Sequence, residues 1–141
     1  MADFPGKLMV DTSYWYAICD PDDTYHDEAA SRFAPFESHG IIFPWPCLYE
    51  TLNTRFVENR SAMERFSAIA RRPNVEHLDD APYREDAYAQ TMGTARTRPI
   101  SLVDTVIRLV LEDVRVRVDG LLTFNLKDFH DVCRRRRVEM L

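Results

Sequence analysis

Residues 8–15 read LMVDTSYW, an apolar run that ends on an acid and two hydroxyl residues. A short apolar run bounded by Gly6 and by a polar turn predicts a buried strand over residues 7–11. Asp11 then stands at the carboxyl end of this strand, where open α/β sheets place their functional sites. Acids and hydroxyl residues are also common helix N-caps, and a short helix is predicted over residues 13–18. Asp11 is therefore both a candidate site residue and a candidate helix cap.

Three further apolar stretches carry an acid or an amide in the same way. They are CLYETLNT at 47–54, SLVDTVIRLV at 101–110 and GLLTFNLKDF at 120–129, and they contain Glu50, Asp104, Asn125 and Asp128. Carboxylates are rare in buried elements unless something positive compensates them. Clustered carboxylates suit a hard divalent cation such as Mg²⁺ or Mn²⁺. The pattern indicates a metal-dependent phosphodiester hydrolase. The alternative is that these residues only cap helices, and none of the four positions decides between the two by itself.

Helical periodicity distinguishes Asp104 from Glu50. An apolar stripe on the helix predicted over residues 101–113 comprises Val103, Val106, Ile107, Val110 and Val114. Asp104 falls at the edge of this stripe, where its side chain can reach a cleft beside the core. Glu50 lies off the stripe of the preceding helix, which is formed by Leu48, Leu52 and Phe56, so periodicity alone predicts a solvent-facing side chain.

Strand and helix patterns alternate along the chain. Strands are predicted over residues 7–11, 40–43, 75–78 and 121–124, and helices over 13–18, 24–36, 61–70, 82–92 and 101–113, besides the helix of Leu48. Thr24 is the expected N-cap of the second helix, with Asp27 completing a capping box. Residues 114–118 alternate Val and Arg and fit neither pattern. Strands separated by helices predict an α/β fold, with a parallel sheet covered on both faces, in one domain over residues 1–141.

Composition limits the class of protein. Hydrophobic residues make up 45% of the chain and charged residues 29%, which is typical of a globular protein. No apolar run reaches the roughly 20 residues of a membrane span, and no signal peptide is evident. Three scattered cysteines without a CxxC pair predict reduced thiols in the cytoplasm rather than a zinc site.

The net charge of −5 argues against a protein that coats nucleic acid, although it permits local action on one. Positive charge is concentrated in two places. Arg55, Arg60, Arg65, Arg71 and Arg72 lie in the middle of the chain, and an unbroken arginine run occupies residues 134–137. The terminal run is interpreted either as a solvated segment or as a contact for phosphate or a partner.

The order of these motifs resembles that of the PIN-domain nucleases, and most closely the toxin-type PIN proteins of bacterial and archaeal toxin–antitoxin pairs. The resemblance rests on VDTS at 10–13, Tyr49-Glu50, SLVDTVIRLV and LLTFNLKDF, and it extends from Leu8 to about Phe129. It implies a three-layer α/β/α sandwich on a mainly parallel sheet. It also implies that Asp11, Glu50 and Asp104 bind Mg²⁺ or Mn²⁺ for RNA cleavage, with Thr12, Ser13 and Thr123 in support.

The chain departs from the family at the fourth acidic position, where it has Asn125. Asparagine can ligate a metal through its carbonyl oxygen but adds no charge. Asp128 is the alternative source of the carboxylate, and we expect Asn125 to lie close to the metal with Asp128 in support or on the surface. Arg55 is the candidate to bind a flanking phosphate of a single-stranded or loop RNA.

The resemblance implies two protein partners, an antitoxin that covers the cleft and a second copy of the chain. The preferred surface for a homodimer comprises Trp45, Leu48, Leu52 and Phe56, although core packing is the stronger interpretation of Leu48 and Leu52.

Two other functions stay open. A receiver-like or haloacid-dehalogenase-like phosphotransfer domain also places an Asp after its first strand, but here no second acid follows Asp11 two residues later and only Lys127 stands late in the chain. The other is a PIN-like module that binds RNA or protein without cleaving it, with Asn125 marking lost metal affinity.

Overall fold

The strands form a parallel sheet, as the alternating pattern predicted. The structure, a computed structural model, describes residues 6–32, 38–93 and 99–141. The strands are β1 (Lys7–Val10), β2 (Gly40–Pro44), β3 (Val75–Leu78), β4 (Gly120–Leu122) and β5 (Glu139–Met140). They lie in the order β3-β2-β1-β4-β5, and every neighbouring pair is parallel. β1 is therefore central, and the carboxyl ends of all the strands share one edge.

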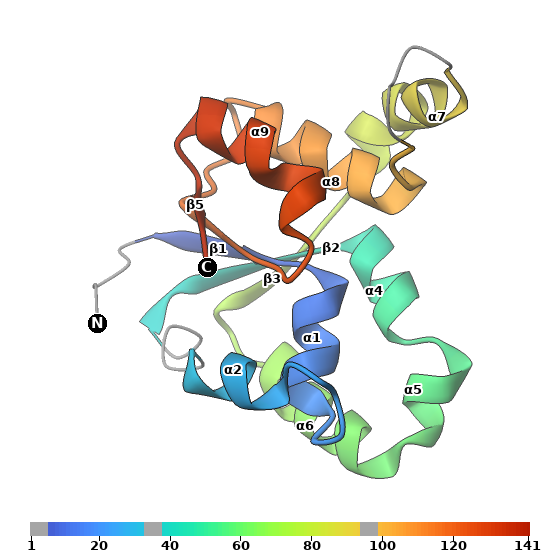
Figure 1. The fold of residues 1–141 in the computed structure, drawn as a ribbon, viewed down its shortest axis with the longest axis vertical. Coiled ribbons are helices and arrows are strands. Elements are labelled where there is room, and N and C mark those ends of the chain that lie inside the picture. The colour runs from blue at the N-terminus through green and yellow to red at the C-terminus, as the bar shows by residue number, and fades with distance from the viewer. Residues whose placement is uncertain (1–5, 33–37, 94–98) are drawn as a thin grey trace.

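Helices cover both faces of this sheet (Figure 1). One layer contains α1 (Thr12–Cys19), α2 (His26–Ser31) and α6 (Arg60–Ala70), with α5 (Thr54–Glu58) packed against α6. The other contains α7 (Arg84–Met92), α8 (Leu102–Glu112) and α9 (Leu126–Arg136), and the short η1 (Ala81–Tyr83) precedes α7. α4 (Trp45–Thr51) follows β2 directly and contacts both α1 and α8. The three-layer α/β/α sandwich is confirmed.

The core lies between these layers and explains why the three central strands, β2, β1 and β4, are mostly apolar. The last three residues of β1 and the residues of β4 are buried, as expected for strands that are covered on both faces. Trp15 of α1 stacks on Phe43 of β2 with ring centroids 4.7 Å apart, and Phe66 of α6 meets both rings edge-on. Cys19, Cys47 and Cys133 are buried free thiols. None of the helices in the described ranges is long and apolar enough to cross a membrane.

The helix predicted through Leu48, Leu52 and Phe56 is in fact two helices. α4 ends at Thr51, and the Asn53 side chain caps α5 by accepting a hydrogen bond from the Phe56 amide at 3.0 Å. Leu48 and Phe56 are buried in the core. These two residues are therefore not available to a dimer, and of the surface predicted for one only Trp45 is strongly exposed.

Other parts of the chain also differ from the sequence-based prediction. α2 begins at His26 instead of after Thr24, because the Asp23 carboxylate accepts from the Tyr25 amide in a turn; residues 33–36 of that prediction lie outside the described ranges. Residues 114–116 turn, and 117–119 approach β4 without regular structure. The last predicted strand stops at Leu122, and the further strand β5 follows α9. Two residues are too few for a strand to be read from periodicity.

Candidate active site

Asp11 is buried at the carboxyl end of β1, where it both caps α1 and faces the site. Its Oδ1 accepts a hydrogen bond from the Thr12 amide at 2.8 Å. Its Oδ2 accepts from the Thr123 hydroxyl at 2.9 Å and from the Ser13 hydroxyl at 3.3 Å. Burial raises the pKa of Asp11 despite these three stabilising bonds. The cap and the site residue predicted from the sequence are thus the same carboxylate.

Ser13 and Thr123 also join the loops that follow β1 and β4. The Ser13 hydroxyl accepts from the Phe124 amide at 3.1 Å, and the Thr123 hydroxyl accepts from the Asn125 amide at 2.9 Å. The Asp11 amide donates to the Leu122 carbonyl at 3.0 Å. The two hydroxyl residues predicted to support the site therefore hold Asp11 and Asn125 in the segments that follow the neighbouring strands β1 and β4.

Asp104 approaches Asp11 from the first turn of α8. The Ser101 hydroxyl caps this helix by accepting from the Asp104 amide at 3.1 Å. Burial, the charge of Asp11 and a hydrogen bond with Asp128 together raise the pKa of Asp104 to about 7. Val106, Ile107 and Val110 of the predicted stripe are buried, while Val114 lies beyond the helix and is exposed.

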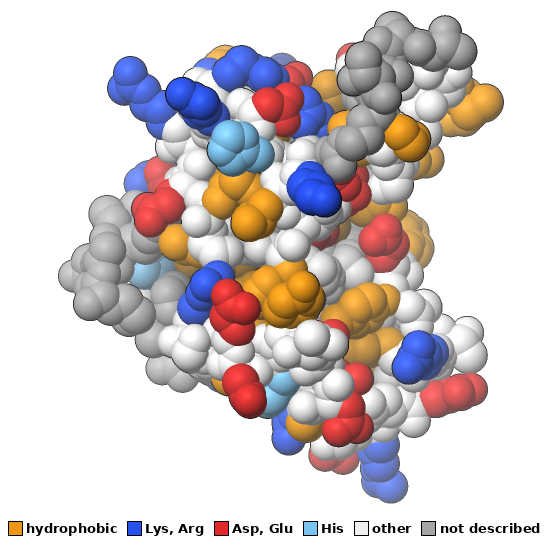
Figure 2. Space-filling view, in the orientation of Figure 1, with side chains coloured by type: hydrophobic (Ala, Val, Ile, Leu, Met, Phe, Trp, Pro, Cys, Tyr) orange, Lys and Arg blue, Asp and Glu red, His pale blue; other side chains and the backbone are white. Residues whose placement is uncertain are grey.

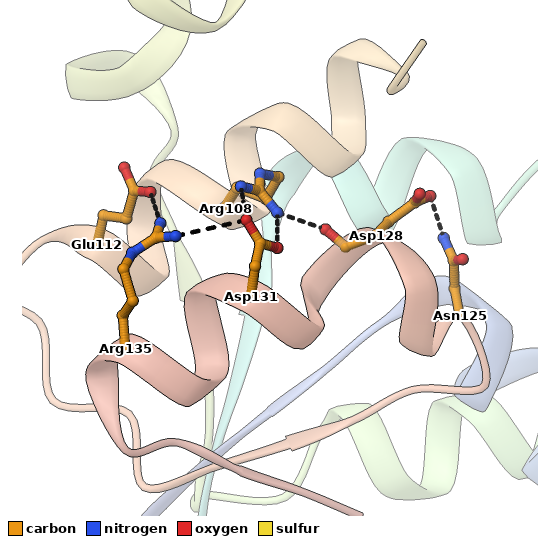
Figure 3. Close-up of polar contacts among 6 residues, drawn as sticks. All are labelled: Arg108, Glu112, Asn125, Asp128, Asp131 and Arg135. Atoms are coloured by element: carbon orange, nitrogen blue, oxygen red, sulfur yellow. Dashed lines mark hydrogen bonds and ion pairs between the residues drawn. The ribbon is translucent and has the colours of Figure 1, made fainter. Parts of the chain in front are cut away.

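Asn125 and Asp128 both join this group, from the start of α9. The Asn125 amide nitrogen donates to Asp104 Oδ2 at 3.2 Å. It also donates to Asp128 Oδ2 at 2.6 Å (Figure 3). Asn125 occupies the N-cap position of α9, yet its side chain makes no capping bond to the helix. Asp128 is half-buried and bonded to Asp104, so it lies within the cluster and not on the open surface.

Glu50 completes the cluster from the last turn of α4. Its side chain is exposed, as periodicity predicted, but partial burial and the charge of Asp11 raise its pKa while a hydrogen bond with the Thr12 side chain lowers it. The Glu50 carbonyl accepts from the Tyr16 hydroxyl at 2.6 Å and from the Asn53 amide at 3.0 Å. The end of α4 is therefore fixed to α1, with the Glu50 carboxylate on the side of Asp11.

Sequence reasoning missed Arg108, which ties α8 to α9 behind the cluster (Figure 3). Its guanidinium bonds both oxygens of Asp131 at 2.6 and 2.7 Å and the Asp128 carbonyl at 2.7 Å. Arg135 extends the network by bonding Glu112 at 2.8 Å and Asp131 at 3.5 Å. The available signal was spacing, because Arg108 lies one turn after Asp104 on its helix.

The donor set fits a hard divalent cation in its chemistry. Each of Asp11, Glu50 and Asp104 has its pKa raised in part by the negative charge of another carboxylate, and all the groups carry oxygen donors. Within the described ranges, however, no three His, Cys, Asp or Glu side chains are close enough together to ligate an ion as they stand.

Neither known family models nor curated protein sequences give a match to this chain. Among solved structures, the chain is similar to VapC20 of Mycobacterium tuberculosis, a toxin that cleaves the sarcin–ricin loop, with a TM-score of 0.68. The identity is 22%, and the match covers 88% of this chain and 94% of VapC20. A likeness at this identity establishes the fold. The chain therefore has the fold of a VapC toxin, in agreement with its resemblance to the toxin-type PIN nucleases.

Proposed function

We propose that this protein is a metal-dependent ribonuclease of the toxin-type PIN family. The observation that carries the proposal is the gathering of Asp11, Glu50, Asp104 and Asp128 at the carboxyl edge of the sheet, on a fold shared with an RNA-cleaving toxin. Asp11, Glu50 and Asp104 would hold Mg²⁺ or Mn²⁺, with Asn125 as the neutral fourth group. A bound divalent cation lowers the pKa of a water molecule and neutralises negative charge at the phosphate.

The residues of the chain would position the reacting groups for hydrolysis. Thr123, Ser13 and the Thr12 amide hold the Asp11 carboxylate in one orientation, which makes it a preorganised acceptor. Asn125 holds the carboxylates of Asp104 and Asp128 through one amide group. Water would add across one phosphorus–oxygen bond, so that one RNA fragment keeps the phosphate and the other gains a hydroxyl.

Attraction of RNA must be local, since the chain as a whole is negative at −5. Lys and Arg side chains gather over the end of the molecule where α9 lies (Figure 2). They include Arg134 and Arg136, which are exposed in the last turn of α9, and the adjacent Arg137. This basic surface lies at the opposite end of α9 from Asn125 and Asp128, so it can attract a polyanion to the molecule but does not adjoin the acids.

The proposal includes a cytoplasmic location and two partners, an antitoxin and a second copy of the chain. Free activity on RNA would harm the host cell, and a segment that places a basic side chain among the acids would block the cleft. Trp45 is 42% exposed and Tyr49 77% exposed on α4, and these aromatic side chains are the surface we assign to a dimer in place of Leu48 and Phe56.

The test is cleavage of single-stranded RNA by the purified chain in Mn²⁺. We expect cleavage to stop in EDTA and to fall by orders of magnitude in Asp11→Asn. The control Asp27→Asn removes an exposed acid of α2 and should cleave as the wild type does. Cleavage that survives both EDTA and Asp11→Asn would contradict the proposal.

A non-catalytic PIN-like module is the second candidate, because an uncharged Asn125 stands at the fourth position and the acids do not converge. RNA binding by the wild type without cleavage, in any divalent cation, would favour that function.

A further inference from the structure

A cavity of about 250 Å³ opens beside the acidic cluster, between the end of α1 and the start of α5. Tyr16 lines it and also reaches the site, because its hydroxyl donates to the Glu50 carbonyl at 2.6 Å. Asn53 lines it as well and donates to the Tyr16 hydroxyl at 2.6 Å. The cavity and the acids are thus held to each other by the same hydrogen bonds.

The apolar part of the cavity is aromatic. Phe56 is buried and Tyr16 half-buried, and their ring centroids lie 5.6 Å apart with a tilt of 37°. Unpaired RNA bases are commonly bound by stacking on aromatic side chains or on the plane of an arginine. Arg55 lies on the same short helix as Phe56 and lines the cavity with it.

The polar part combines donors and acceptors that retain bonding capacity. Arg55 makes no ion pair with any residue of the described ranges. Asn59 uses its side-chain oxygen to cap α6, accepting from the Ala62 amide at 3.1 Å, which leaves its amide hydrogens available. Asp20 and Asp23 each use Oδ1 to accept from a nearby backbone amide, at 3.0 and 2.9 Å. Their other carboxylate oxygens are available to a ligand.

This combination selects among the groups of an RNA. A bare phosphate is disfavoured, because Asp20 and Asp23 would repel it in the same cavity, although the sequence alone made Arg55 a candidate for phosphate. A base with both acceptors and donors fits better. Guanine presents O6 and N7 to an arginine fork, and its N1–H and N2–H₂ groups can donate together to one carboxylate.

We propose that this cavity binds a guanine base of the RNA, next to the phosphate that is cleaved. The inference rests on the proposed function and deepens it, since it assigns a base preference to the same site. Arg55 would bind the O6/N7 edge, one of Asp20 and Asp23 would accept from N1 and N2, and Tyr16 and Phe56 would contact the face of the ring.

The test measures binding without cleavage. Fluorescence anisotropy in EDTA compares short labelled oligouridines that carry one central guanosine, adenosine or cytidine, or none. We expect the wild type to bind the guanosine oligomer most tightly. Arg55→Gln should lower that preference roughly 5- to 150-fold, the usual discrimination of one bidentate contact. Arg60→Gln is the matched control, because Arg60 is 93% exposed and lies outside the cavity.

Cleavage-site mapping in Mn²⁺ on an RNA of mixed sequence separates this inference from the proposed function. Cleavage with no guanine preference, in binding or in mapping, would overturn the inference and leave the ribonuclease intact. A guanine preference in EDTA without any cleavage in Mn²⁺ would contradict the ribonuclease and leave the guanine-binding cavity intact. The inference also falls if the wild type binds no oligomer, or if it prefers another base.

A protein partner is the remaining occupant to test. A short arginine-containing peptide serves as the probe for a protein partner that inserts a basic side chain into the cavity. Peptide binding that is lost in Asp20→Asn and Asp23→Asn, with RNA preference unchanged in the same variants, would assign the cavity to that partner and overturn the inference. Equal melting temperatures for the wild type, Arg55→Gln and Arg60→Gln would show that differences in RNA binding do not come from loss of folded protein.

Discussion

Replacing Asp104 by asparagine should stabilise the metal-free protein. The pKa of Asp104 rises from 3.8 to about 7, so the folded protein favours the protonated acid. An asparagine imitates that neutral form. Its amide nitrogen can donate to Asp128, and its oxygen can accept from Asn125 as Asp104 Oδ2 now does at 3.2 Å. The substitution therefore removes a charge without removing a hydrogen bond.

The size of the effect follows from the shift in pKa. The rise in the pKa of Asp104 from 3.8 to about 7 corresponds to at most about 4 kcal/mol. This is the free energy of unfolding that the wild type loses at pH 8, where Asp104 is ionised. Solvent screening at this half-buried side chain reduces the expected gain for Asp104→Asn to about 1–2 kcal/mol, or roughly 3–8 °C in melting temperature.

The sign of the pH dependence is also determined. Between pH 3.8 and about 7 the folded protein holds a proton on Asp104 that the unfolded chain has released. The free energy of unfolding of the wild type should therefore fall as pH rises through this window, and the curve of Asp104→Asn should be flatter. The two proteins should converge near pH 4.

Mn²⁺ should invert the order of the two proteins. Saturation at about 100 times Kd adds roughly 2.7 kcal/mol to a protein that binds the ion only when folded. We expect this gain in the wild type and little of it in Asp104→Asn, as measured by thermal melting in EDTA and in millimolar Mn²⁺. A lower melting temperature for Asp104→Asn in EDTA at pH 8 would refute the reasoning.

The control Asp131→Asn should behave in the opposite way. Its hydrogen bonds with Arg108 hold the pKa of Asp131 well below its usual range, so its stabilising contribution is present above pH 4 and is lost as pH falls. Asp131→Asn should lower the melting temperature at pH 8, and it should leave the response to Mn²⁺ unchanged.

Two further predictions concern the start of α9. Arg108→Gln should destabilise the protein by about 1–2 kcal/mol in urea unfolding, because it removes the paired bonds to Asp131 and the bond to the Asp128 carbonyl; an unchanged midpoint would contradict this role. By isothermal titration, Asn125→Asp should tighten Mn²⁺ binding and Asn125→Ala should weaken it modestly. Collapse of binding in Asp128→Ala alone would instead make Asp128 the essential fourth group.

Much of the fold could be predicted because its signals are local. The apolar run before Asp11 predicted β1, and the apolar stripe that starts at Val103 predicted α8, since both patterns are read within a few residues. The break between α4 and α5 was missed because Leu48, Leu52 and Phe56 keep helical spacing across it. The bond from Asn53 that starts α5 is visible only once the chain has turned.

The proximity of the candidate site residues could be predicted from the sequence, but the detailed geometry of the cluster could not. Asp11 and Asn125 lie together because the parallel strands β1 and β4 end at one edge, whereas Asp104 and Asp128 reach them from the first turns of α8 and α9. Three features depend on which elements are neighbours in the fold. They are the burial of Asp11, the hydrogen bonds from Arg108 to α9 and the cavity that Arg55 lines. No local pattern contains that information. The prediction that Arg55 binds a phosphate was therefore made without knowing that Asp20 and Asp23 line the same cavity.

Asn125 and Asp128 are better understood as a pair than as rival fourth groups. The Asn125 amide nitrogen donates to Asp104 at 3.2 Å and to Asp128 at 2.6 Å, and an aspartate at position 125 could make neither bond. It would also repel both carboxylates. The amide therefore allows an acid one turn along α9 to stay beside Asp104, while Arg108 fixes that turn through the Asp128 carbonyl. With asparagine at position 125, the negative charge at this end of α9 is carried by Asp128.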